Sequence, residues 1–67
     1  MNTDVLEGKW SEFKGEAKAK WGELTDDDLA KAEGDAEALV GALQAKYGYE
    51  RAKAEREVED WVASLKS

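Results

Sequence analysis

Apolar side chains recur at spacings of three or four near both ends of this chain, and such spacing places them on one face of an α-helix. The first apolar stripe consists of Leu6, Trp10, Phe13, Ala17 and Trp21. The last consists of Ala54, Val58, Trp61, Val62 and Leu65. No stretch alternates apolar and polar residues as a half-buried β-strand does, so the pattern predicts an all-α protein.

End signals divide the first half of the chain into two predicted helices. Asp4 and Glu7 match the capping box that starts a helix, and we expect Gly22 to end it in the left-handed conformation. Thr25 then caps a short second helix, whose acidic first turn suits the positive end of the helix dipole. Gly34 is expected to end or bend this helix.

The second half of the chain predicts two further helices. The third runs from about Asp35 to Tyr47, and Gly48 stops it. Its inward positions are Leu39, Val40, Leu43 and Tyr47. The fourth follows Glu50, which is a weak N-cap compared with Ser, Thr, Asp or Asn.

A sixteen-residue stretch occurs twice, as Glu7–Gly22 and Glu33–Gly48. Gly15 matches Gly41, and the endings Ala-Lys-Trp-Gly and Ala-Lys-Tyr-Gly are nearly the same. Looking for such repeats first is sound because they set the architecture. The duplication and the short turns predict a four-helix domain in which two related antiparallel hairpins pack on each other.

Three glycines fall inside the helical patterns, at Gly8, Gly15 and Gly41. Each costs roughly 1 kcal/mol relative to alanine in a helix interior. Either these glycines allow close helix–helix contact, or the fold is only just stable. We take close contact as the preferred interpretation.

The composition fits one domain spanning residues 1–67. The chain has no cysteine, histidine or proline, so it offers no disulfide and no thiolate metal site. No apolar run approaches the roughly 18 residues of a membrane span, and the N-terminus lacks the features of a signal peptide. We therefore expect a monomeric cytoplasmic protein that does not bind membranes.

The net charge of −6 is concentrated in residues 25–37, which we call the acidic segment. Its acidic residues, opposed only by Lys31, are Asp26, Asp27, Asp28, Glu33, Asp35 and Glu37. Such a surface repels a phosphate backbone, so nucleic acid is not expected as a partner. A basic protein surface is the alternative partner, and the candidate contact residues are Asp26, Asp27, Asp28, Glu33, Asp35 and Tyr49.

Other candidate sites are better explained as structure. The three consecutive aspartates lack the spacing of a calcium loop, and we interpret them as a capped first turn. The five Trp and Tyr residues are expected in the core rather than on a base-stacking surface, with Tyr49 partly exposed in a turn. The lysines of residues 9–20 alternate with glutamates, which favours a solvated helix face over a lipid-binding one.

Catalysis is not expected from this composition. Acid–base chemistry at neutral pH usually needs a histidine or a carboxylate of raised pKa in a cleft. The chain has no histidine, and a domain of 67 residues has little interior left for a substrate. We therefore predict no catalytic residue, no cofactor, no metal and no small-molecule substrate.

Seven short motifs are distributed along the chain, and they are Gly8-Lys9-Trp10, Lys14-Gly15-Glu16, Lys20-Trp21-Gly22, Leu24-Thr25-Asp26-Asp27-Asp28-Leu29, Glu33-Gly34, Leu39-Val40-Gly41 and Tyr47-Gly48-Tyr49. Together these motifs resemble the CsbD-like family of small bacterial stress-response proteins. The resemblance runs from Asn2 to about Leu65, departing at Glu50, where the family commonly has a capping serine. It implies two orthogonally packed α-hairpins, a SAM-like arrangement, in a cytoplasmic bacterial protein, and it brings no established enzymatic activity.

Two functional hypotheses follow from the resemblance and the charge distribution. The first is a non-catalytic stress protein that acts as a hydrophilic protectant or interaction module. The alternative is a specific protein-binding module that uses the acidic segment. A DNA-binding helical domain is a weaker third hypothesis, because it depends on fold analogy alone.

Overall fold

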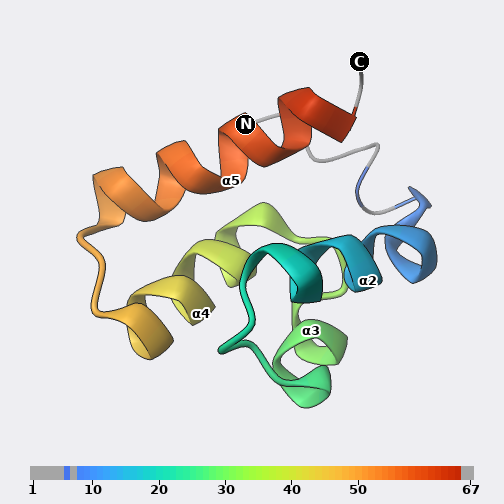
Figure 1. Ribbon diagram of the computed structural model, residues 1–67, viewed down its shortest axis with the longest axis horizontal. Coiled ribbons are helices and arrows are strands. Elements are labelled where there is room, and N and C mark those ends of the chain that lie inside the picture. The colour runs from blue at the N-terminus through green and yellow to red at the C-terminus, as the bar shows by residue number, and fades with distance from the viewer. Residues whose placement is uncertain (1–5, 7, 66–67) are drawn as a thin grey trace.

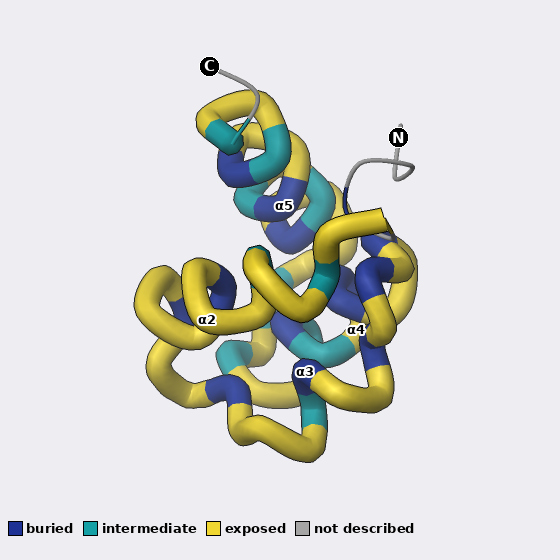
Figure 2. Tube along the Cα trace, turned by 90° about the vertical axis from the view of Figure 1, so that its right-hand side faces the viewer, coloured by how far each residue is buried: buried dark blue, intermediate teal, exposed yellow. Residues whose placement is uncertain are grey.

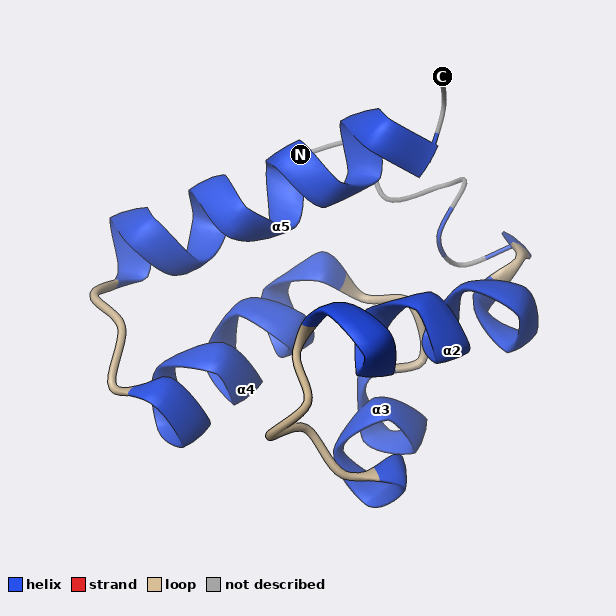
Figure 3. Ribbon diagram, viewed as in Figure 1, coloured by secondary structure: helices blue, strands red, loops and turns tan. Residues whose placement is uncertain are grey.

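A computed structural model describes Leu6 and residues 8–65. Over that part of the chain it is all-helical, with no strand (Figures 1 and 3). The helices are α2 (Trp10–Lys20), α3 (Asp26–Ala32), α4 (Ala36–Tyr47) and α5 (Arg51–Leu65). Within the described residues, the predicted all-α class with four helices is therefore confirmed.

The start of α2 differs from the prediction. Asp4 and Glu7, the expected capping box, lie outside the described residues. Within them, α2 begins only at Trp10, because Lys9 has φ −129° and ψ 27° and interrupts the helical geometry. The Lys9 side chain makes no capping hydrogen bond, so this end of α2 is closed by backbone contacts alone.

The end of α2 also differs, because Gly22 is not in the left-handed conformation. Among the described glycines, positive φ angles occur at Gly34 and Gly48. Trp21 ends α2 with φ −120°, while its backbone N–H still bonds to the carbonyl of Ala17. The Leu24 N–H then bonds to the Trp21 carbonyl. Because Trp21 and Leu24 are both buried, the turn follows their packing and does not need a left-handed glycine.

Both ends of α3 follow the sequence signals. The Thr25 hydroxyl accepts a hydrogen bond from the Asp28 N–H at 3.1 Å, and the Asp28 carboxylate accepts one from the Thr25 N–H at 3.0 Å. This reciprocal pair is a capping box. Glu33 and Gly34 have φ values of 51° and 81°, so α3 ends in left-handed backbone as Gly34 predicted.

The helices α4 and α5 form an antiparallel hairpin (Figure 1). Asp35 caps α4 by accepting a hydrogen bond from the Glu37 N–H, and Gly48 ends it with φ 70°. The Ala54 N–H bonds to the Glu50 carbonyl, so the first turn of α5 starts at Glu50. The predicted start and end of α4 and the predicted start of α5 are confirmed.

The helices pack in chain order, α2 on α3, α3 on α4 and α4 on α5. The first helix of each repeat begins at an equivalent position, Trp10 in α2 and Ala36 in α4, which agrees with the internal duplication. The right-angled, SAM-like packing of the two hairpins stays a prediction.

Three tryptophans join the N-terminal and C-terminal halves of the core. The ring centroids of Trp21 and Trp61 lie 5.2 Å apart at 71°, and those of Trp10 and Trp61 lie 6.5 Å apart at 86°. Edge-to-face pairs of this kind are favourable beyond the area they bury. Buried positions occur on every described helix (Figure 2), and all of the described buried side chains are apolar. The expectation that the tryptophans are used in the core is confirmed for Trp21 and Trp61, and Trp10 is partly buried against the core.

The interior glycines do not serve helix packing, which corrects the preferred interpretation. A Cβ atom built on Gly8, Gly15 or Gly41 meets nothing within 4 Å. All three positions are exposed and have no positive φ. Close approach between helices is therefore not the reason for these glycines. Gly15 and Gly41, which lie inside α2 and α4, remain a cost to helix stability, whereas Gly8 precedes α2.

Candidate functional site

The acidic segment covers α3 with its N-cap, the turn that follows α3, and the start of α4. Its carboxylates are exposed or half-buried, and most of them contact a basic side chain or a backbone N–H group. The partners come from three other helices as well as from α3. Each pairing changes the charge that this surface offers to a partner.

Asp26 and Asp27 carry the most exposed ion pairs. The Lys18 amine of α2 lies 2.7 Å from the Asp26 carboxylate, whose side chain is 86% exposed. Asp27 pairs with Lys31 one turn later at 3.1 Å, and both side chains are 76% exposed. The hydrogen bond and positive charge of Lys18 lower the pKa of Asp26. Exposed pairs of this kind contribute little to stability.

Asp28 has a structural role at the same end of α3. Hydrogen bonds from Thr25, first from its backbone N–H, lower the pKa of Asp28, and the charge of Lys46 adds to this effect. The Lys46 amine of α4 lies 3.4 Å from the Asp28 carboxylate. The interpretation of the three aspartates as a capped first turn is confirmed.

The remaining acidic residues begin and end helices. Asp35 is the N-cap of α4. Glu37 forms an ion pair with Arg51 at the start of α5, and this contact raises the pKa of Arg51. Glu33 is the left-handed residue after α3, and it has no basic partner among the described residues.

The partners of the acidic segment explain how a strongly charged stretch folds. Sequence spacing identifies only the pair of Asp27 and Lys31, which is an i,i+4 pair within one helix. Lys18, Lys46 and Arg51 are brought in by tertiary packing. No local signal in the sequence assigns them to particular carboxylates.

Tyr49 lies apart from these carboxylates in the turn between α4 and α5. Its half-buried ring stacks on Tyr47, with centroids 5.1 Å apart and an interplanar angle of 17°. The Lys53 amine lies 4.4 Å from the centre of the Tyr49 ring, at cation–π distance. The expected partial exposure of Tyr49 is confirmed, and its ring contacts Tyr47 and Lys53 rather than an aspartate.

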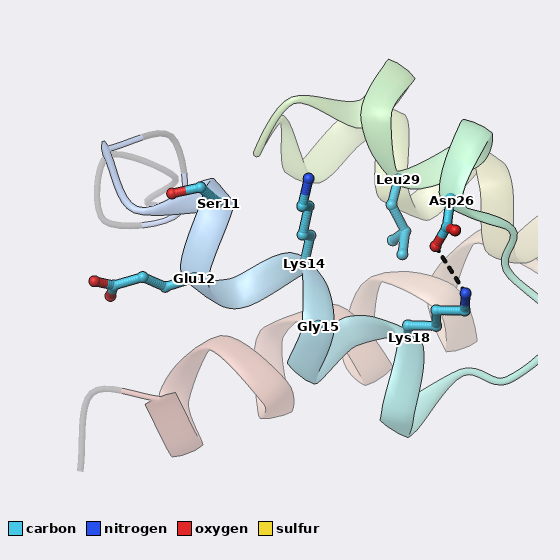
Figure 4. A pocket seen from close by; sticks show the side chains of 7 residues that line it. All are labelled: Ser11, Glu12, Lys14, Gly15, Lys18, Asp26 and Leu29. Atoms are coloured by element: carbon cyan, nitrogen blue, oxygen red, sulfur yellow. Dashed lines mark hydrogen bonds and ion pairs between the residues drawn. The ribbon is translucent and has the colours of Figure 1, made fainter.

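A shallow hollow of about 240 Å³ lies between α2 and α3 (Figure 4). Gly15 contributes no side chain to it, while Leu29 of α3 points toward α2 and the pair of Lys18 and Asp26 lies at one end. The Ser11 hydroxyl points away from the Lys14 amine, so the two do not form a nucleophile and base pair (Figure 4). The hollow is therefore a groove in the helix packing with charged edges.

Within Leu6 and residues 8–65, no group of three or more acidic side chains is placed to hold a metal ion. In that same part of the chain, no helix combines the length and apolar character needed to cross a membrane.

The fold and the acidic surface define a small, highly charged helical protein, and comparison with known proteins gives its family. The CsbD-like family model matches residues 4–56. The chain therefore belongs to the CsbD-like family, as its motifs indicated.

Bacterial relatives match almost the whole chain. A UPF0337 protein of Xanthomonas axonopodis pv. citri is 53% identical over 98% of this chain and 96% of its own length. A UPF0337 protein of Pseudomonas aeruginosa is 54% identical over 91% of this chain and 94% of its own. UPF0337 protein YjbJ of Escherichia coli is 51% identical over 91% of this chain and 88% of its own length. These names indicate no catalytic family.

Proposed function

We propose that this protein is a non-catalytic cytoplasmic stress-response protein that protects other macromolecules through its hydrated, charged surface. The observation that carries the proposal is the separation of charge from the core. Every described buried side chain is apolar, and the described charged side chains lie outside the core. Membership of the CsbD-like family supports the stress-response role.

The helical content of the protein is expected to depend on the amount of water around it. Interior glycines lower helix stability, and α2 starts without a side-chain cap. As water is withdrawn, backbone groups lose their competing solvent partners, and internal hydrogen bonds become relatively stronger. The protein then becomes more helical under the conditions in which clients need protection.

Protection is tested by drying a labile enzyme with and without this protein, and measuring the activity that survives rehydration. We expect survival to exceed that with an equal mass of an uncharged polymer. Circular dichroism at rising osmolyte concentration should show increasing helicity. Survival no better than with the polymer would contradict protection, and constant helicity would contradict the water-dependent folding.

A second candidate function is binding to a basic protein through the acidic segment. The observation that favours it is the exposure of Asp26 and Asp27, because a partner's lysine or arginine can replace Lys18 or Lys31 at little cost. Attraction between complementary charged surfaces would speed the encounter.

This candidate is tested with the double variant Asp26→Asn and Asp27→Asn, which leaves the structural Asp28 in place. The matched control is Glu59→Gln with Asp60→Asn, an exposed acidic pair on α5. We expect proteins co-purified with the wild type from stressed cells to be lost with the first variant and kept with the control. Equal recovery with both variants would exclude Asp26 and Asp27 as the binding residues.

A further inference from the structure

The helix α2 is held to the molecule by fewer buried contacts than the other long helices. Within Trp10–Lys20, Ala17 is the one buried residue, whereas α4 buries Ala36, Leu39, Val40 and Leu43. Trp10 and Phe13 are only partly buried against the core. Ala17 removes little apolar area from water, so α2 depends on the partly buried rings of Trp10 and Phe13, whereas α4 has four fully buried side chains.

The polar contacts of α2 are also weak. The ion pair between Lys18 and Asp26 is largely exposed, and such pairs contribute little. One part-buried hydrogen bond, from the Trp10 indole N–H to the Leu29 carbonyl at 2.8 Å, ties the first turn to α3. The N-cap of α2 has no side-chain hydrogen bond, and the Gly15 position is open on the exposed face.

The turn that follows α2 is anchored much more firmly. Trp21 is buried against Trp61, and its indole N–H donates to Glu57 of α5 at 3.3 Å. Leu24 is buried, and the Glu23 N–H donates to the Tyr47 hydroxyl. This turn holds to α4 and α5 through contacts that do not involve residues 10–20.

We propose that α2 opens as a separate unit, with Trp21 as its hinge, while α3, α4 and α5 remain folded. Opening withdraws Trp10 from Trp61 and takes the buried Leu6, which precedes α2, out of the core. The Leu29 carbonyl loses the Trp10 indole donor but still accepts from the Glu33 N–H, and the packing of α4 on α5 stays intact. Proteins commonly open locally in units whose free energies lie below that of global unfolding. In this chain, α2 is the element whose contacts satisfy that condition.

Native-state hydrogen exchange followed by NMR tests the proposal. We expect the protection factors of the α2 amides to be at least tenfold lower than those of amides in the middle of α4 and α5. Low concentrations of denaturant should leave exchange in α2 nearly unchanged, because a small opening exposes little surface. The proposal would be overturned if the opening free energies of amides in all helices fell along one common line with denaturant concentration.

The internal repeat supplies a matched pair of variants, Gly15→Ala in α2 and Gly41→Ala in α4. Both positions are exposed and open, so each alanine fits and stabilises its own helix, raising protection factors about fivefold. Gly15→Ala should raise protection in all helices, because α2 is unfolded in both the open and the globally unfolded states. Gly41→Ala should raise it in α4 and α5 and leave α2 unchanged. An equal rise in α2 with Gly41→Ala would show that α2 opens only by global unfolding.

Discussion

The hydroxyl of Tyr47 accepts a hydrogen bond at 3.1 Å from the backbone N–H of Glu23, which joins the end of α4 to the turn between α2 and α3. Tyr47 and Trp21 occupy equivalent positions in the two repeats. Trp21 is buried beside Trp61, whereas Tyr47 is partly buried and presents its hydroxyl to the turn after Trp21. Trp21 and Tyr47 thus lie at the same turn, where Trp21 packs in the core and Tyr47 accepts a hydrogen bond.

Replacing Tyr47 with phenylalanine removes this hydrogen bond and keeps the ring. We expect the free energy of unfolding to fall by roughly 0.5–1 kcal/mol, toward the lower end because water can reach the freed N–H. Urea denaturation followed by circular dichroism measures the change. Tyr49→Phe is the control, because the Tyr49 hydroxyl makes no hydrogen bond within the described residues. Equal losses in both variants would contradict the role of the Tyr47 hydroxyl.

Thr25→Ala removes the capping box of α3. The Asp28 N–H then loses its acceptor, and we expect a loss of about 0.5–2 kcal/mol in the free energy of unfolding. Thr25→Ser keeps an equivalent hydroxyl and should be close to wild type. Thermal melts of the two variants test this, and a serine variant as unstable as the alanine variant would argue against capping.

Gly48 and Gly22 end the two repeats and should respond differently to alanine. Gly48 has φ 70°, where a Cβ atom is strained, so Gly48→Ala should cost about 1 kcal/mol. Gly22 has no positive φ and open space around it, so Gly22→Ala should change stability by less than about 0.5 kcal/mol. Chemical denaturation of both variants compares them. A large loss at Gly22 would contradict the turn geometry described above.

Trp61 is the shared partner of the other two tryptophans, and its truncation should have the largest effect. A buried Trp→Ala change costs about 3–5 kcal/mol, close to the entire stability expected of so small a domain. We therefore expect Trp61→Ala to be largely unfolded by circular dichroism and NMR. Val62→Ala, a half-buried neighbour on the same helix, should remain folded with a loss of about 1 kcal/mol. A well-folded Trp61→Ala variant would show that the tryptophan cluster is dispensable.

Stability should decline in acid because Asp26 and Asp28 have lowered pKa values in the folded protein. A lowered folded-state pKa stabilises the protein above the unfolded pKa of about 4, and this stability is lost as the pH falls through the folded value. The free energy of unfolding should therefore fall as the pH drops below about 4. Asp28→Asn keeps an acceptor for the Thr25 N–H but cannot titrate, so its pH dependence should be flatter. An unchanged acid profile in this variant would remove Asp28 as a contributor.

Much of the fold follows from local features of the sequence. Helix positions follow from apolar spacing, because a helix buries one face at a time. The ends marked by Thr25, Gly34 and Gly48 follow from backbone chemistry that acts within a few residues. The family could also be recognised from motifs distributed along the chain.

Features that depend on distant neighbours could not be predicted from the sequence. Gly22 looks like Gly48 in sequence, but burial of Trp21 and Leu24 sets a different turn. The helical glycines suggested close packing, yet the neighbouring helices leave Gly15 and Gly41 open.

The acidic surface likewise combines features set by the sequence with features set by the tertiary structure. The sequence by itself determined the helices, the core tryptophans and the position of the acidic segment, because each depends on local spacing and composition. Only the tertiary structure decided that Lys18, Lys46 and Arg51 pair with the acidic segment. The physical reason is that an ion pair depends on a distance of a few ångströms in space, and helix packing rather than chain order sets that distance.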